Sequence, residues 1–132
     1  MKDATTVNYL DELGKTNAPK NIDYLQIDLE VSNESTIKTL ENLNSQVMEE
    51  YKFAVVTFEH DIYTGNHFNT RNRSRAIFSS RGYVRLFSDV KNSNSPYEDW
   101  YVHPDLVSQE FIDKYKNDKS HEYSEIIGIL NK

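Results

Sequence analysis

Acidic side chains gather at two places in this sequence where an apolar, strand-like segment ends. Asp28 and Glu30 close the first of these segments, and Glu59 and His60 follow the second. Ligands of open α/β sheets bind outside the carboxyl ends of the strands, so side chains at two consecutive strand ends are expected to share one crevice. Chains also become polar at ordinary strand ends, and a plain surface role remains the alternative.

These residue types support two kinds of chemistry. Asp28, Glu30, Glu59 and His60 are candidate catalytic residues, because a carboxylate or an imidazole can act as a general base on a hydroxyl group. Asp28, Glu59 and His60 are also candidate ligands of a divalent metal, through carboxylate oxygens and a ring nitrogen. A histidine in such a position is more often structural or exposed than a ligand.

The segment after the second acidic group offers candidate substrate-binding residues. Tyr63 and His67 lie on an expected loop, and Arg71 and Arg75 lie on the helix expected after it. All arginines of the chain fall between Arg71 and Arg85, although the net charge is −6. A local basic patch suits an anionic small molecule, and a solvated helix face is the equally weighted alternative.

Hydrophobic periodicity predicts the elements that carry these residues. Alternation over 22–29 predicts a largely buried strand, and the continuous apolar run FAVVTF predicts a second one over 53–58. Further elements are helices over 6–14, from 35 through 43, over 71–80 and from about 108, and strands over 83–87 and 100–103. The segment 116–122 is expected to be polar and mobile, and 126–130 to be a short apolar tail. This order predicts an α/β fold, with a mainly parallel sheet of about four strands that ends in an antiparallel hairpin and is flanked by helices.

Length and composition restrict the class of protein. A chain of 132 residues predicts one domain over 1–132, with its core in 5–107 and a C-terminal helix and tail in 108–132. The net charge of −6 argues against a nucleic-acid binder. The sequence has no cysteine for disulfides and no apolar run of membrane-spanning length. With no signal-peptide pattern, a cytoplasmic location is expected.

Four segments together resemble the C-terminal half of FkbM-type S-adenosylmethionine-dependent methyltransferases. They are IDYLQIDLE (22–30), YKFAVVTFEHD (51–61), RGYVRLF (81–87) and EDWYVHPDLV (98–107). The resemblance covers about residues 5–107 and implies a Rossmann-like sheet to which this chain supplies the fourth to seventh strands. It implies O-methyl transfer from S-adenosylmethionine to a sugar or another hydroxylated small molecule. It also matches Asp28, Glu30, Glu59 and His60 to the family's two strand-end motifs.

The chain departs from the family pattern at two points. Val31 stands where the family usually has glycine, and none of the four glycines forms a glycine-rich strand–helix loop for the cofactor. Three functions stay open: a methyltransferase or remnant, a non-catalytic sugar- or nucleotide-binding module, and an assembly subunit. In each case the strand over 22–29 should lie at a sheet edge, which a homo-oligomer or a partner chain is expected to cover.

Overall fold

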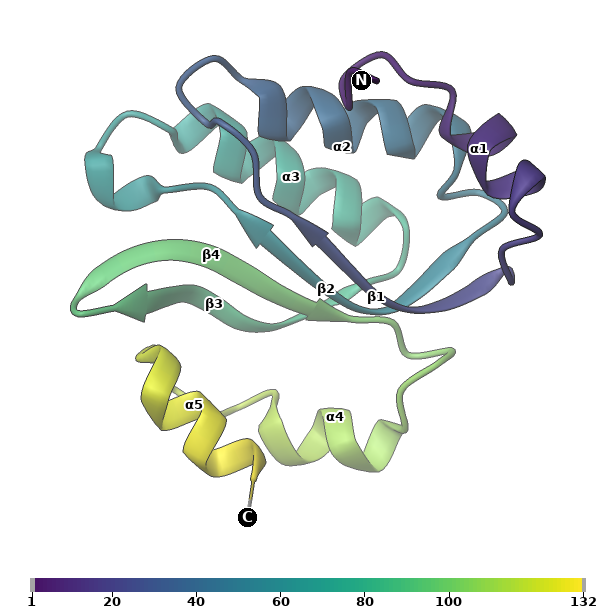
Figure 1. Ribbon diagram of the computed structural model, residues 1–132. Coiled ribbons are helices and arrows are strands. Elements are labelled where there is room, and N and C mark those ends of the chain that lie inside the picture. The colour runs from purple at the N-terminus through teal and green to yellow at the C-terminus, as the bar shows by residue number, and fades with distance from the viewer. Residues whose placement is uncertain (1, 132) are drawn as a thin grey trace.

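The computed structural model describes residues 2–131, which form an α/β fold built on a four-stranded mixed sheet (Figure 1). Its strands are β1 (Asn21–Ile27), β2 (Lys52–Glu59), β3 (Val84–Asn92) and β4 (Ser95–Val102). Its helices are α1 (Tyr9–Lys15), α2 (Ser35–Gln46), the 3₁₀ turn η1 (Ile62–Thr64), α3 (Phe68–Ser80), α4 (Gln109–Tyr115) and α5 (Tyr123–Leu130). The predicted α/β class, the number of strands and the flanking helices are confirmed.

The strand order is β1-β2-β4-β3, and this corrects the prediction of a mainly parallel sheet. Only β1 and β2 pair in parallel, whereas β4 is antiparallel to both β2 and β3. The hairpin itself was predicted, and its turn at Ser93 and Asn94 has φ values of 53° and 68° that suit it; the parallel pairing of β2 with β3 is lost because β4 lies between them. After this turn β4 runs antiparallel to β3. It inserts between β2 and β3 instead of lying outside them.

The sheet separates two layers of helices. α1, α2 and α3 cover one face, and α4 and α5 lie on the other (Figure 1). The larger apolar core lies under α2 and α3, where Ile37, Leu40 and Phe78 are fully buried against the sheet. The smaller core lies under α4 and α5 and includes Phe87 and Ile126.

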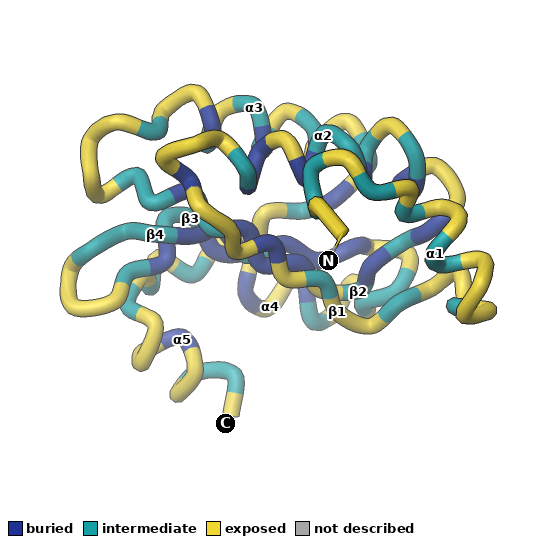
Figure 2. Tube along the Cα trace, turned by 45° about the horizontal axis from the view of Figure 1, so that its top comes forward, coloured by how far each residue is buried: buried dark blue, intermediate teal, exposed yellow. Residues whose placement is uncertain are grey.

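Two elements differ from the sequence prediction. The expected apolar tail over 126–130 is the helix α5, which docks through the fully buried Ile126. The strand expected to be largely buried over 22–29 is β1, in which only Ile27 is buried (Figure 2). β1 lies at the sheet edge and has strand neighbours on one side only, so its alternating apolar residues stay partly exposed.

Candidate functional site

The end of β2 divides the predicted site into two clusters. Successive side chains of a strand point to opposite faces, so Glu59 and His60 diverge. Glu59 lines a groove on the α5 side of the sheet together with Asp28. His60 is fully buried and contacts Asp89 and Asp99. The predicted metal set of Asp28, Glu59 and His60 is therefore not brought together.

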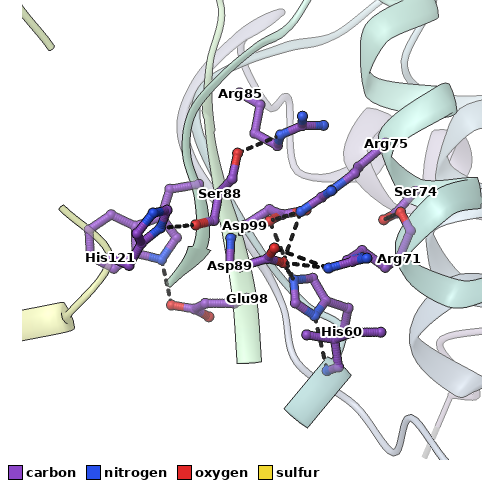
Figure 3. Close-up of polar contacts among 12 residues, drawn as sticks. His60, Arg71, Ser74, Arg75, Arg85, Ser88, Asp89, Glu98, Asp99 and His121 are labelled. Atoms are coloured by element: carbon purple, nitrogen blue, oxygen red, sulfur yellow. Dashed lines mark hydrogen bonds and ion pairs between the residues drawn. The ribbon is translucent and has the colours of Figure 1, made fainter. Parts of the chain in front are cut away.

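The first cluster, here called the His60 network, joins β3, β4 and α3 beside the end of β2 (Figure 3). His60 Nε2 lies 3.2 Å from Asp89 Oδ1 and 3.3 Å from Asp99 Oδ1. Arg75 donates from Nε to Asp99 Oδ2 at 2.8 Å and from Nη2 to Asp99 Oδ1 and Asp89 Oδ1 at 2.9 Å. Arg71 Nη1 donates to both oxygens of Asp89, at 3.1 and 3.0 Å. Two carboxylates thus receive two guanidinium groups and one imidazole.

Electrostatics favour the charged forms within this network. Burial alone would raise the pKa of Asp99, but hydrogen bonds from His60 and Arg75 outweigh it and hold that pKa well below its usual value. Burial alone would lower the pKa of His60, but hydrogen bonds to Asp89 and Asp99 outweigh it and raise that pKa. Because His60 Nδ1 accepts a hydrogen bond from the backbone N–H of Ile62 at 3.2 Å, it is Nε2 that carries the proton facing the two carboxylates.

The His60 network also has the spacing of a metal site. One ring nitrogen of His60 and one oxygen each of Asp89 and Asp99 all lie within 4.8 Å of one another. However, Arg71 and Arg75 already donate to the two carboxylates, and His60 Nε2 faces them as a hydrogen-bond donor because Nδ1 accepts from the Ile62 N–H. The positive charge that a metal would place beside the two carboxylates is provided here by Arg71 and Arg75.

The second cluster, here called the carboxyl cluster, consists of Asp28, Glu59 and Glu98. Asp28 follows β1, Glu59 ends β2, and Glu98 lies opposite Glu59 on β4. Burial, together with hydrogen bonds to Asp28 and Asp61, raises the pKa of Glu59 to about 9, so this carboxyl is protonated at neutral pH. Burial likewise raises the pKa of Glu98, against the opposing hydrogen bonds from Trp100 and Tyr97.

The carboxyl cluster opens into a groove of about 440 Å³ between the sheet and α5. Its aromatic lining residues are Tyr24, Tyr97, Trp100 and Tyr123. The Tyr24 hydroxyl is hydrogen-bonded to Thr57 Oγ1 at 2.7 Å, and Trp100 Nε1 donates to Glu98 Oε1 at 2.5 Å. Aromatic faces beside hydrogen-bonding carboxyl groups suit a small hydroxylated ligand, and the volume lies within the range of small-molecule sites.

The other predicted residues are dispersed. Glu30 is exposed and accepts hydrogen bonds from the backbone N–H and the hydroxyl of Ser32. Tyr63 lines a second cavity of about 320 Å³ that also contains Glu59. His67 precedes α3 and is half-buried. Of these residues, only Tyr63 shares a cavity with Glu59.

The arginines do not form a free basic patch. Arg71 and Arg75 belong to the His60 network, Arg73 pairs with Glu41, and Arg81 donates to Asn44. Arg85 Nε donates to Ser88 Oγ at 2.7 Å. Since Arg71, Arg73 and Arg75 pair with carboxylates of the chain, their attraction for an anionic ligand is largely neutralised.

Sequence reasoning missed Asp89, Glu98 and Asp99, which complete both clusters. The sequence did not indicate Asp89 as a site residue, because it lies in an irregular part of β3 where its φ is 52° and strand alternation does not hold. Glu98 and Asp99 precede Trp100 within β4. Two adjacent acidic residues inside a strand are unusual, and this pattern could have marked both of them as candidate site residues. Adjacent strand residues face opposite ways, so one serves each cluster.

Comparisons with known protein families, with curated proteins and with solved structures return no match to this chain. The site therefore has to be interpreted from its own chemistry. Among residues 2–131, none of the helices combines the length and apolarity that crossing a bilayer requires.

Proposed function

We propose that this chain is the acceptor-binding half of an FkbM-like O-methyltransferase and that the carboxyl cluster holds the acceptor, a sugar or another hydroxylated small molecule. The observation that carries the proposal is the meeting of Asp28 and Glu59. They come from the carboxyl ends of two adjacent parallel strands and face an aromatic-lined groove. The four segments that resemble this family support the same reading.

The strand arrangement also supports the proposal. Three strands, β1, β2 and β3, run in one direction, and the last strand is reversed and lies between the second and third. A set of strands that ends in one antiparallel member agrees with the expectation that the chain supplies the fourth to seventh strands of a Rossmann-like sheet.

The two central carboxyl groups suit different tasks. Glu59 holds a proton at neutral pH and shares it with Asp28 and Asp61, and a ligand oxygen that replaces one of these partners can accept its hydrogen bond. Asp28 is exposed at the mouth of the groove and can accept a hydrogen bond from a ligand hydroxyl. One donor beside one acceptor fixes the orientation of a hydroxyl group, which is what positioning an acceptor requires.

The residues of this chain do not fit the methyl-donating cofactor by themselves. Val31 is 2% exposed, and its side chain fills the turn after β1 where a glycine would leave the backbone open. Of the two glycines with positive φ, Gly82 follows α3, and Gly65 stands alone in the segment between β2 and α3, so neither belongs to a glycine-rich strand–helix loop. We therefore derive no methyl-transfer step from this chain alone and assign cofactor binding to other polypeptide segments. A non-catalytic sugar-binding module, which would use the same groove, is the second candidate.

Trp100 provides the test, because it is the only tryptophan of the chain and lines the groove. Titration with a panel of neutral monosaccharides should change its fluorescence saturably. Asp28→Asn and Glu59→Ala should weaken binding about tenfold each, by the loss of one charged or geometrically fixed hydrogen bond, whereas Glu59→Gln keeps a donor and should bind nearly as well as the wild type. Glu49→Gln, an exposed acid far from the groove, should bind like the wild type.

The outcomes separate the candidates. A saturable response together with methylation of the bound sugar, when S-adenosylmethionine and a polypeptide that binds it are added, supports the methyltransferase. A saturable response without methylation supports the binding module. No fluorescence change at millimolar sugar would contradict both functions.

A further inference from the structure

The two faces of the sheet differ in what compensates their carboxyl groups. On the α3 face, the two carboxylates of the His60 network accept hydrogen bonds from the guanidinium groups of Arg71 and Arg75. On the α5 face, no ion pair among residues 2–131 involves a member of the carboxyl cluster. None of the described residues that line the groove is a lysine, arginine or histidine. The groove therefore contains acids but no cation of its own.

Aromatic rings form much of the wall of the same groove. The rings of Trp100 and Tyr123 meet at 87° with their centroids 6.2 Å apart, so they form a corner between β4 and α5. The polar ends of Trp100 and Tyr24 are already occupied, by Glu98 and Thr57 respectively. A ligand in the groove therefore meets these rings mainly through their faces, which carry partial negative charge.

Carboxyl groups and aromatic faces favour the same kind of ligand. Both attract a cation, the carboxyl groups by ion pairing and the rings through their quadrupoles. Both repel an anion, and a neutral ligand gains only hydrogen bonds and apolar contact. The pKa of Glu59 agrees with this electrostatic character, because burial and hydrogen bonds to Asp28 and Asp61 raise it to about 9 where no cation stands beside it.

We propose that the groove selects a hydroxylated ligand that carries a cationic nitrogen, an amino sugar or an amino alcohol, over neutral and anionic ligands of the same shape. The ammonium group would pair with Asp28 and lie against the aromatic faces of the groove. It would supply the positive charge that Arg71 and Arg75 supply on the opposite face. This selectivity rests on the proposed function, because it specifies the acceptor that the same groove holds.

A series of sugars that differ in charge provides the test. Titrations followed by Trp100 fluorescence would compare glucosamine, glucose and glucuronate, which are cationic, neutral and anionic at slightly acidic pH. Glucosamine should bind about tenfold tighter than glucose, because an ion pair and a cation–π contact are added to the hydrogen bonds of the sugar. Glucuronate should bind more weakly than glucose. Added salt should reduce the advantage of glucosamine and leave the affinity for glucose unchanged.

Variants of the lining residues locate the source of the selectivity. Asp28→Asn keeps the shape of an exposed residue, and it should weaken the binding of glucosamine more than that of glucose, so that the two sugars bind alike. Tyr123→Leu keeps an apolar wall without a ring, and it should weaken the binding of glucosamine while nearly preserving that of glucose. The matched control Glu49→Gln removes an exposed acid outside the groove and should keep the full selectivity.

A second pair of probes isolates the charge from the position of the amine on the sugar. Choline and its uncharged carbon isostere, dimethylbutanol, share one shape and one hydroxyl group, and choline should bind more tightly. If glucose binds but neither cation binds more tightly than its neutral counterpart, the selectivity is overturned and the proposed function stands. If none of these compounds binds at millimolar concentration, the proposed function is contradicted together with the selectivity.

Discussion

Removing the charge of Asp99 should be among the most damaging single changes to this protein. Its side chain is fully buried and accepts hydrogen bonds from Arg75, His60 and the backbone N–H of Asp89. Asp99→Asn keeps the volume but leaves the Arg75 guanidinium and the His60 Nε2–H with the single carboxylate of Asp89. Breaking a buried ion pair in this way costs about 3–5 kcal/mol of the free energy of unfolding.

Urea unfolding followed by Trp100 fluorescence measures this loss. With a slope of about 2 kcal/mol per M, the midpoint should fall by about 2 M. Asp113→Asn, which removes an exposed acid paired with Lys116, should change stability by under about 0.5 kcal/mol and is the matched control. An Asp99→Asn variant within about 1 kcal/mol of the wild type would refute the assignment of the His60 network as a buried ionic cluster.

The pH dependence provides an independent check on the same network. The lowered pKa of Asp99 stabilises the fold above its unfolded value of 3.8, and this stabilisation is lost as the pH falls towards the folded pKa. The raised pKa of His60 stabilises the fold below its unfolded value of 6.5, and this is lost as the pH rises through the folded pKa. The network should thus contribute most to the free energy of unfolding between pH 3.8 and 6.5. In the Asp99→Asn variant, the free energy of unfolding should change less with pH both below and above that range.

Two further predictions concern the carboxyl cluster and the glycines. The pKa of Glu59 is raised from 4.5 to about 9, so stability should fall as the pH rises between those values. The full shift corresponds to about 6 kcal/mol, but solvent screening of this half-exposed group leaves about 1–2 kcal/mol. Glu59→Gln should abolish that slope in thermal melts recorded from pH 5 to 9, and an unchanged slope would exclude Glu59 as its source. Gly82 has a φ of 85°, so Gly82→Ala should cost about 1 kcal/mol, whereas Gly128→Ala inside α5, where nothing lies within 4 Å, should gain up to about 1 kcal/mol. Urea midpoints measure both changes, and equal effects of the two substitutions would contradict the backbone argument.

The local pattern was enough to predict most of the fold. FAVVTF is apolar on both faces, which identified β2 as a central strand, and the spacing of Ile37, Leu40 and Leu43 identified α2. The order of the strands was less accessible. The polar segment 92–96 predicted a hairpin, but nothing local shows that β4 inserts next to β2 instead of lying outside β3. That choice depends on packing across the whole sheet.

The candidate site was predicted in part for the same reason. Asp28 and Glu59 meet because parallel neighbours end at the same sheet edge, and strand alternation alone could have separated Glu59 from His60. The partners of His60 come from β3 and β4, which the sequence places about 30 to 40 residues later. Contacts of that separation leave no periodic signal.

The inserted β4 explains how the two clusters coexist at the end of one strand. It brings Glu98 and Asp99 beside Glu59 and His60, so each face of the sheet receives one acid from β4. On the α3 face, arginines neutralise the acid and the result is a rigid ionic support. On the α5 face no arginine approaches the carboxyl cluster among the described ion pairs, and Glu59 keeps its proton instead. The same strand pair therefore supplies an ionic cluster on one face and, on the other, carboxyl groups that hydrogen-bond to one another and to aromatic donors, where a ligand can compete for those bonds.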